Sequence, residues 1–344
     1  MFANKASPSG RDLTRSASVW LGLALSLPGA FGVLHAASLV SEPVGCVRVV
    51  IPAPAAGETT RKVLGVPFNR ASVFRGIVTS VAGATLKAGT PAWTGSQFVS
   101  EPHYLKFRTG PNAGRYFAVT ANTADTLTVS APGVTIAEKQ VFEVFPAQTL
   151  GSLFGASSVP LRTGTSETSA DLVRLHNGTA WSTYFHTGEQ WQISGGTSSQ
   201  NGTIIRPEQG LIVVASGTSP VSLALRGSVS ITSEASAIPG VGESLVANRL
   251  PFATTLSALK IQFLSGWTKG PAASVADNLM NWNGSVWNVY YHTGARWQMA
   301  GSQASQDGAS LPAGESLLIR RRDGSTASAA FLDTAAPFSY TLSE

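Results

Sequence analysis

Charge and cysteine are both scarce in this chain. Only 12% of the residues are charged, about half the fraction found in an average soluble protein, so hydroxyl and amide side chains must supply much of the solubility. The only cysteine, Cys46, cannot form an internal disulfide, and the fold must therefore depend on its apolar cores. We expect Cys46 to be a buried structural thiol, because the segment Pro43-Val44-Gly45-Cys46 has proline where a lipidation site has leucine.

Catalytic and metal-binding motifs are also missing from the sequence. It contains no G-x-S-x-G, H-E-x-x-H or C-x-x-C pattern and no glycine-rich phosphate loop. The segments Gly242-Glu243-Ser244 and Gly314-Glu315-Ser316 lack the glycine that follows the nucleophile of a strained elbow. We therefore expect a protein that is not an enzyme and uses no cofactor or metal. A secreted hydrolase with paired carboxylates is a third interpretation, since the fold sets the geometry of such a pair.

The first 37 residues have the composition of a secretory signal peptide. Three basic residues precede an apolar stretch at 19–33, and the small residues Ala36 and Ala37 follow it. The stretch is shorter than the roughly 20 residues that span a bilayer. We predict export to the periplasm, the cell surface or the medium, with no transmembrane span after cleavage. The net charge of +5 includes those three basic residues, so it does not indicate a nucleic-acid partner.

Strand signals fill the rest of the chain. Short β-branched and aromatic runs alternate with Gly, Pro, Asn and Asp, and no helical period persists over about ten residues. Before residue 147 the strand candidates are Val47–Ile51, Phe74–Val78, His103–Phe107, Tyr116–Thr120, Thr126–Val129 and Val141–Phe145. We predict an all-β protein with an N-terminal β-sandwich or small barrel followed by two copies of a β-meander module. The expected boundaries are 1–37 for the signal peptide, 38–146 for the N-terminal module, 147–232 for repeat module 1 and 233–344 for repeat module 2.

The two copies are visible as a self-similarity. Residues 149–202 align without a gap on residues 255–308, so that Ala170 matches Ala276 at an offset of 106. The first copy continues ADLVRLHNGTAWSTYFHTGEQWQ and the second ADNLMNWNGSVWNVYYHTGARWQ. In both, an Asn-Gly pair indicates a two-residue type I′ hairpin, and His-Thr-Gly indicates a second turn. A weaker similarity relates Val66-Pro67-Phe68 to Leu250-Pro251-Phe252, and we base no prediction on it.

Strand alternation sorts the side chains of each copy onto two faces. We expect the recurring tryptophans, Trp181, Trp191, Trp287 and Trp297, to be buried in the core. A two-residue hairpin would put Asp171 opposite Tyr184 and Asp277 opposite Tyr290. The opposite, polar face of the two copies would then hold Asp171, Tyr184, His186, Gln192, Asp277, Tyr290, His292 and Gln298.

This polar face is the candidate ligand-binding surface. Tyrosine and histidine beside carboxylate and amide groups suit recognition of polyhydroxylated ligands. A structural interpretation competes with it, because His186 and His292 begin the His-Thr-Gly turn and can hydrogen-bond nearby backbone. The expected register also puts Val173 on the polar face and Arg174 on the apolar face, against their chemistry.

Several segments together resemble a known family. They are RTGPNAGRYFAVTANTADTLTV from Arg108, TLGSLFG from Thr149, and A-D-x-x-x-x-x-N-G with W-x-x-Y followed by PEQGLIV. With the signal peptide, they resemble an uncharacterised family of secreted verrucomicrobial-type proteins that occur in several copies per genome. The resemblance implies export and strand content, and it supplies no catalytic residues.

The sequence favours an exported, non-enzymatic structural or binding protein of the cell envelope or extracellular matrix. The alternative is a carbohydrate-binding protein that uses the duplicated Tyr/His faces. Expected partners are glycans or other envelope proteins.

Overall fold

The computed structural model describes residues 43–131, 133–176, 180–322 and 330–335, so the expected signal peptide lies outside the described residues. Within them the protein is all-β, as predicted, and the helices are single turns. These are α1 (Gln97–Ser100), α2 (Leu150–Phe154) and the 3-10 helix η1 (Ile261–Phe263). No helix in this part of the chain is long and apolar enough to cross a membrane.

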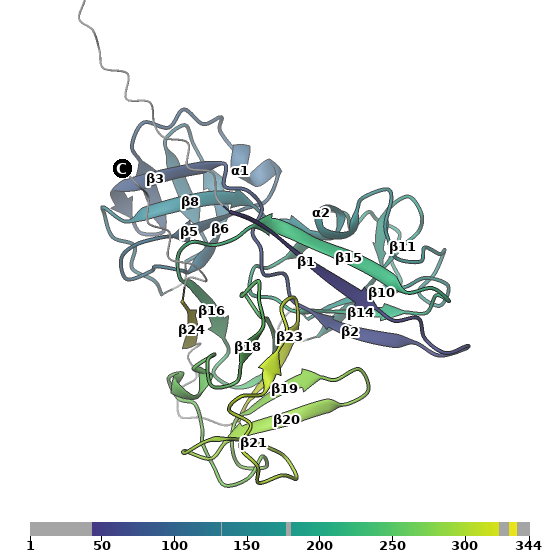
Figure 1. The fold of residues 1–344 in the computed structure, drawn as a ribbon. Coiled ribbons are helices and arrows are strands. Elements are labelled where there is room, and N and C mark those ends of the chain that lie inside the picture. The colour runs from purple at the N-terminus through teal and green to yellow at the C-terminus, as the bar shows by residue number, and fades with distance from the viewer. Residues whose placement is uncertain (1–42, 132, 177–179, 323–329, 336–344) are drawn as a thin grey trace, which may run out of the picture. The chain divides into compact units, whose positions relative to one another are not determined.

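A closed six-stranded barrel occupies the middle of the N-terminal half, with strand order β3-β4-β7-β6-β5-β8 (Figure 1). Its strands are β3 (Phe74–Ala82), β4 (Thr85–Ala88), β5 (His103–Phe107), β6 (Tyr116–Asn122), β7 (Thr126–Val129) and β8 (Val141–Pro146). Alternate apolar side chains such as Leu86, Leu105 and Phe142 fill its interior with no exposed surface. The predicted strand runs in this region are confirmed, because alternation and turn residues are local signals.

A first module surrounds a separate core. It contains a five-stranded sheet of order β12-β11-β10-β14-β2, a ribbon β1-β15 and a short pair β9-β13. Its strands are β1 (Val44–Ile51), β2 (Thr60–Leu64), β9 (Gln148–Thr149), β10 (Leu172–His176), β11 (Trp181–His186), β12 (Trp191–Ile193), β13 (Ile204–Ile205), β14 (Leu211–Ala215) and β15 (Val221–Ser228).

A second module has the same strand arrangement and its own core. Its five-stranded sheet has the order β17-β23-β19-β20-β21, and β16-β24 and β18-β22 are the accompanying pairs. Its strands are β16 (Glu234–Ile238), β17 (Gly242–Ala247), β18 (Thr254–Thr255), β19 (Asn278–Trp282), β20 (Trp287–His292), β21 (Trp297–Met299), β22 (Ser310–Leu311), β23 (Ser316–Arg321) and β24 (Ala330–Thr334).

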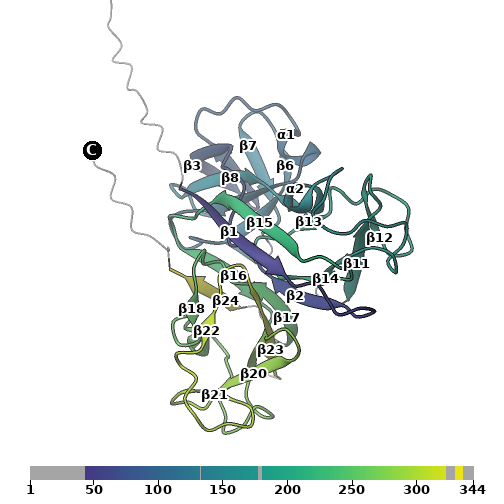
Figure 2. The same cartoon turned by 45° about the vertical axis from the view of Figure 1, so that its right-hand side comes forward.

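The barrel interrupts the first module. Strands β1 and β2 precede the barrel in the chain, yet β2 pairs with β14 just as β17 pairs with β23 (Figure 2). In the second module residues 248–253 join β17 directly to β18, where the first module carries the barrel. Strands β1 and β2 lie before residue 146 in the chain but pair with strands that lie after it, so the first module is built from two separate segments. This pairing also explains the weak similarity of residues 66–68 to 250–252, since both segments follow the equivalent strand.

The hairpin register differs by two residues from the expected one. Val173 lies opposite Tyr184, and Leu279 lies opposite Tyr290. In the second module the loop contains four residues, because Trp282 pairs with Trp287. The Asn283 side chain accepts hydrogen bonds from the backbone N–H of Ser285 and Val286, both at 2.9 Å. Residues 177–179 of the first loop lie outside the described residues.

The expected assignment of the two faces is wrong. Tyr184 and Val173 are 7% and 0% exposed and face the core, whereas Trp181 is 44% exposed. Trp287 is only half-buried. Trp191 and its counterpart Trp297 are fully buried, as predicted. A shift of two residues keeps every side chain on its own face, so the register does not cause the wrong assignment. The assignment fails because the prediction takes the face with Trp181 as the core face, whereas the face with Val173 is buried.

Cys46 is exposed, so the prediction of a buried thiol is also wrong. It lies on the outward face of β1, directly opposite Arg226 of β15. Exposed and covered side chains alternate along β1, and one cysteine carries no information about which face it occupies.

Candidate functional site

The two aspartates of the expected binding face hold loops together. Asp171, 1% exposed, accepts hydrogen bonds from the backbone N–H of Arg162 at 2.9 Å and of Ser216 at 2.7 Å. Asp277, 0% exposed, accepts the corresponding bonds in the second module, from Thr268 at 2.8 Å and Arg322 at 2.7 Å. Both pairs of donors are again separated by 106 residues. A buried carboxylate with several such donors is stabilised as a structural anchor.

The two histidines brace the turns that they begin. His186 Nδ1 accepts a hydrogen bond from Gly188 N–H, and His292 Nδ1 accepts one from Gly294 N–H, both at 3.0 Å. The glycines have φ of 107° and 106°, a region that side-chain-bearing residues rarely adopt. Each histidine also packs edge-to-face on the buried tryptophan opposite it, with ring centroids 5.4 Å apart. Burial lowers the pKa of His292.

The expected set of side chains is not gathered on one surface. Gln192 lies opposite Phe185, and Gln298 lies opposite Tyr291, on the face away from Tyr184 and its counterpart Tyr290. Burial raises the pKa of Tyr290. The Asp, Tyr and His side chains face the core, so a ligand cannot reach them in this conformation.

The structure instead shows two grooves where the modules meet. Groove A has a volume of about 460 Å³, within the ~300 to 1,000 Å³ typical of ligand sites. It is lined by Val50, Pro52, Thr60, Arg61, Lys62, Asn281, Trp282, Asn283, Gly284, Ser285, Ser310, Pro312 and Glu315. The first five belong to the first module around β1 and β2, and the others belong to the second module.

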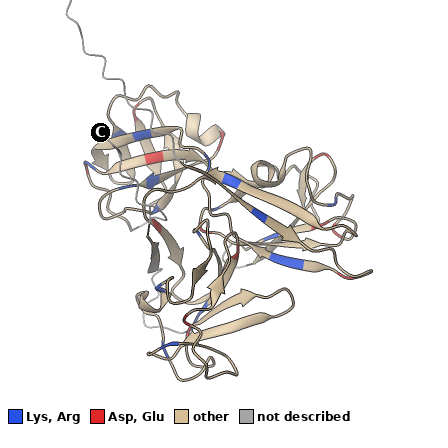
Figure 3. Ribbon diagram, in the orientation of Figure 1, with Lys and Arg blue, Asp and Glu red and all other residues tan. Residues whose placement is uncertain are grey.

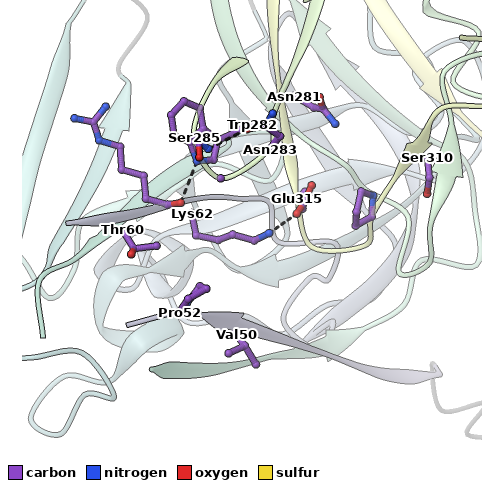
Figure 4. A pocket seen from close by; sticks show the side chains of 13 residues that line it. Val50, Pro52, Thr60, Lys62, Asn281, Trp282, Asn283, Ser285, Ser310 and Glu315 are labelled. Atoms are coloured by element: carbon purple, nitrogen blue, oxygen red, sulfur yellow. Dashed lines mark hydrogen bonds and ion pairs between the residues drawn. The ribbon is translucent and has the colours of Figure 1, made fainter. Parts of the chain in front are cut away.

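Three side chains give groove A its chemistry. Lys62 reaches toward Glu315 and forms an ion pair with it, with Trp282 above and Val50 and Pro52 below (Figure 4). The indole N–H of Trp282 donates to the Arg61 carbonyl at 3.1 Å, which fixes the ring. Trp282 also packs edge-to-face on Trp287 at 5.5 Å. Groove A therefore combines an aromatic platform with charges and with amide and hydroxyl groups.

Groove B has the same volume, about 460 Å³, and uses the corresponding positions of the other module. It is lined by His176, Arg206, Glu208, Gln209, Ala237, Pro239, Gly240, Val241, Glu243, Ser244, Leu245 and Val246. His176 and Gln209 are the counterparts of Trp282 and Glu315 at the offset of 106.

Strand register relates the remaining positions of the two grooves. Arg61 pairs with Val214 of β14, and Glu243 pairs with Arg320 of β23, the residue 106 positions further on. Lys62 and Ser244 correspond in the same way. The scaffold is thus the same in both grooves, while the chemistry has changed from Trp, Arg and Lys to His, Glu and Ser.

Reciprocal contacts hold the modules together between the grooves. Leu64 forms an isolated antiparallel β-bridge with Glu315, and Val246 forms the corresponding β-bridge with Gln209. The Gly65 N–H donates to the Gly314 carbonyl at 3.0 Å, and Ala247 N–H donates to the Glu208 carbonyl at 2.9 Å. Each module therefore contacts the other through the same two segments, which are residues 64–65 and 208–209 in the first module and residues 246–247 and 314–315 in the second.

A buried charged network joins the barrel to both modules. Arg249 binds Glu234 at 2.7 Å, the carbonyl of Val66 at 2.7 Å and the carbonyl of Pro207 at 2.9 Å. Barrel residues Lys106 and Tyr116 approach the same pair, at 3.3 Å from Glu234 and 3.2 Å from Arg249 respectively. Since every cation here has an anionic partner and the nearby cavities hold about 10 Å³ each, the network has a structural role.

The charges in this network shift its pKa values strongly. Burial alone would raise the pKa of Glu234, but the charges of Arg249 and Lys106 lower it to about 2. Burial and the Glu234 charge raise the pKa of Tyr116 to about 12. Both groups therefore keep one protonation state over the physiological range.

No protein-family model, curated protein or solved structure matches the chain. Among residues 43–335 that the structure describes, no three His, Cys, Asp or Glu side chains cluster so as to hold a metal ion. Sequence reasoning missed both grooves because each combines segments far apart in the chain. The similarity of residues 66–68 to 250–252 was the one signal that could have placed β2 beside the repeated segments.

Proposed function

We propose that the protein is an exported, non-enzymatic binding protein of the cell envelope or extracellular matrix, and that grooves A and B are its binding sites. The observation that carries this proposal is the pair of equal grooves at corresponding positions of two modules. We propose that an internal duplication produced them. Two sites on one chain can hold two ligand segments at once, which suits a protein that links components of the envelope or matrix.

Carbohydrate is the ligand class that groove A favours. An indole offers an apolar ring face, and asparagine, serine and threonine side chains supply both donors and acceptors for hydroxyl groups. The Asn281 side chain lines groove A, and its buried Oδ1 atom has no hydrogen-bond partner among the described residues. A side-chain rotation that exposes this atom would let it accept from a ligand hydroxyl. This keeps the carbohydrate interpretation of the sequence but moves it from the Tyr/His faces to the grooves.

A glycan array tests this proposal, with the secreted protein and a Trp282→Ala, His176→Ala variant compared side by side. We expect the wild type to bind at least one glycan and the variant to lose that binding while it stays folded, with a single cooperative melting transition. Equal binding by both proteins would move the site elsewhere, and absence of wild-type binding would refute the carbohydrate class.

Export is the second part of the proposal, and it is supported by the basic stretch, the apolar stretch and Ala36-Ala37 of the sequence. N-terminal sequencing of the protein recovered outside the cytoplasm tests it. We expect a mature chain that begins near residue 38, and an intact Met1 on membrane-bound material would contradict the expectation.

A further inference from the structure

The two grooves differ most in their uncompensated charge. In groove B, Glu243 is paired with Arg320 at 2.6 Å and Arg206 with Glu208 at 3.5 Å. In groove A, Lys62 is paired with Glu315, but the exposed Arg61 guanidinium forms no ion pair within the described part of the chain. Among the described residues, groove A therefore presents an unpaired cation at Arg61, and groove B has the paired carboxylate of Glu243 at the corresponding position.

Arg61 and Trp282 are held next to each other by the backbone. The indole N–H bonds to the main-chain carbonyl of Arg61, so the ring lies next to the residue that carries the guanidinium, and both residues line groove A. A planar guanidinium binds a carboxylate through two parallel hydrogen bonds. A sugar ring on the indole would thus place a ring carboxylate within reach of Arg61.

Further basic residues continue from groove A along the ribbon β1-β15. Val50 lines the groove, and Arg48 lies two residues earlier on the same face of β1. Arg226 follows on β15, opposite Cys46, and Figure 3 shows basic positions on both strands. Neither arginine forms an ion pair among the described residues. Successive side chains on one strand face are about 7 Å apart, so this track suits a polymer rather than a single sugar.

We propose that groove A and the outward face of the ribbon bind a polysaccharide of acidic, carboxylate-bearing sugars. This inference rests on the proposed binding function and narrows its ligand. The hydroxyl and amide lining of groove A suits sugar hydroxyls, whereas a single-stranded nucleic acid would need several stacking rings along its path. In groove B the position of Arg61 holds Glu243, which is paired with Arg320 and offers no cation to a carboxylate, so the two grooves have diverged in specificity.

Affinity electrophoresis of the full secreted chain tests the proposal, with gels that contain alginate or polygalacturonate and gels that contain neutral pullulan. We expect retardation by the acidic polymers only, weakening as NaCl is raised because salt screens exposed charges. Arg61→Gln should weaken binding by about tenfold or more, as loss of a charge-assisted hydrogen bond pair does. Arg61→Lys, which keeps the charge without the planar fork, should give an intermediate affinity.

The matched control is Arg296→Gln, because it removes an exposed guanidinium of the second module that lines neither groove. It should leave retardation by alginate unchanged. Retardation by pullulan equal to that by alginate would overturn the acidic class but leave the binding function standing, whereas no retardation by any glycan would overturn both. Tighter binding of polyglutamate or of an oligonucleotide would overturn the sugar class, and equal losses from Arg61→Gln and Arg296→Gln would overturn the assignment to groove A.

Discussion

Substitution of Glu234 by glutamine tests the buried network most directly. Glu234 is 3% exposed and binds both Arg249 and Lys106. Removing one partner of a buried ion pair destabilises a protein by about 3 to 5 kcal/mol, because the remaining charges are left uncompensated. The pKa gives a similar magnitude, since a drop from 4.5 to about 2 corresponds to about 3 kcal/mol of stabilisation of the charged form.

The loss should depend on pH in a defined direction. The folded pKa of Glu234 lies below the unfolded value, so its contribution to stability is complete above about pH 4.5 and declines as the pH falls toward 2. Urea unfolding followed by tryptophan fluorescence should therefore show a gap of about 3 to 5 kcal/mol between wild type and Glu234→Gln at pH 7. That gap should narrow steadily in acid.

The matched control is Glu243→Gln, which removes a carboxylate from an exposed ion pair with Arg320. Exposed pairs contribute about 0 to 1 kcal/mol, so this variant should unfold close to wild type. If Glu234→Gln cost no more than the control, or if its cost were the same at pH 3 as at pH 7, the network would not carry the electrostatic role assigned to it.

Other positions give further tests by urea unfolding and NMR. Trp191→Ala should lower the free energy of unfolding by about 3 to 5 kcal/mol because this tryptophan is fully buried. Trp181→Ala, at a 44% exposed position, should lower it by less than about 1 kcal/mol. Equal losses would contradict the assignment of the two faces. Arg321→Ala should cost about 3 to 5 kcal/mol because Asp277 would lose its buried partner, and a neutral outcome would refute that. His292 should titrate below 6.5 in its NMR shifts, and its contribution to stability should fall as the pH drops below 6.5, because the unfolded chain takes up the proton first.

The strands could be predicted from the sequence because their signals are local. Alternation of apolar residues and the Gly, Pro and Asn residues of the turns sufficed for β3, β5, β6, β7 and β8. The six-stranded closure depends on the pairing of β4 with β7 and of β5 with β8, which are far apart in the chain, and alternation does not indicate which strands pair. Strand β4 was not predicted.

The predicted candidate site is misplaced because the prediction assumes that polar side chains are exposed. Tyr184 and His186 are buried, and the imidazole of His186 satisfies its nitrogens with Gly188 N–H and the Ala156 carbonyl. A polar side chain with such partners belongs in a core. Strand alternation places Val173 on the same face as Tyr184 and His186, and this valine indicates that the face is apolar.

The barrel can be inserted into the first module without breaking the strand pairing of that module. Its first and last strands, β3 and β8, are neighbours, with Phe74 opposite Val144. The chain therefore enters and leaves the barrel at one place, and β2 and β9 need not separate to accommodate it.

The buried network then links the barrel to the grooves. Arg249 holds the carbonyl of Val66, just after β2 of groove A, and the carbonyl of Pro207, inside the segment that lines groove B. Lys106 and Tyr116 of the barrel in turn hold the Glu234–Arg249 pair. Because rigid support of lining residues reduces the entropy lost on binding, the barrel would favour the proposed binding at both grooves by fixing these two carbonyls.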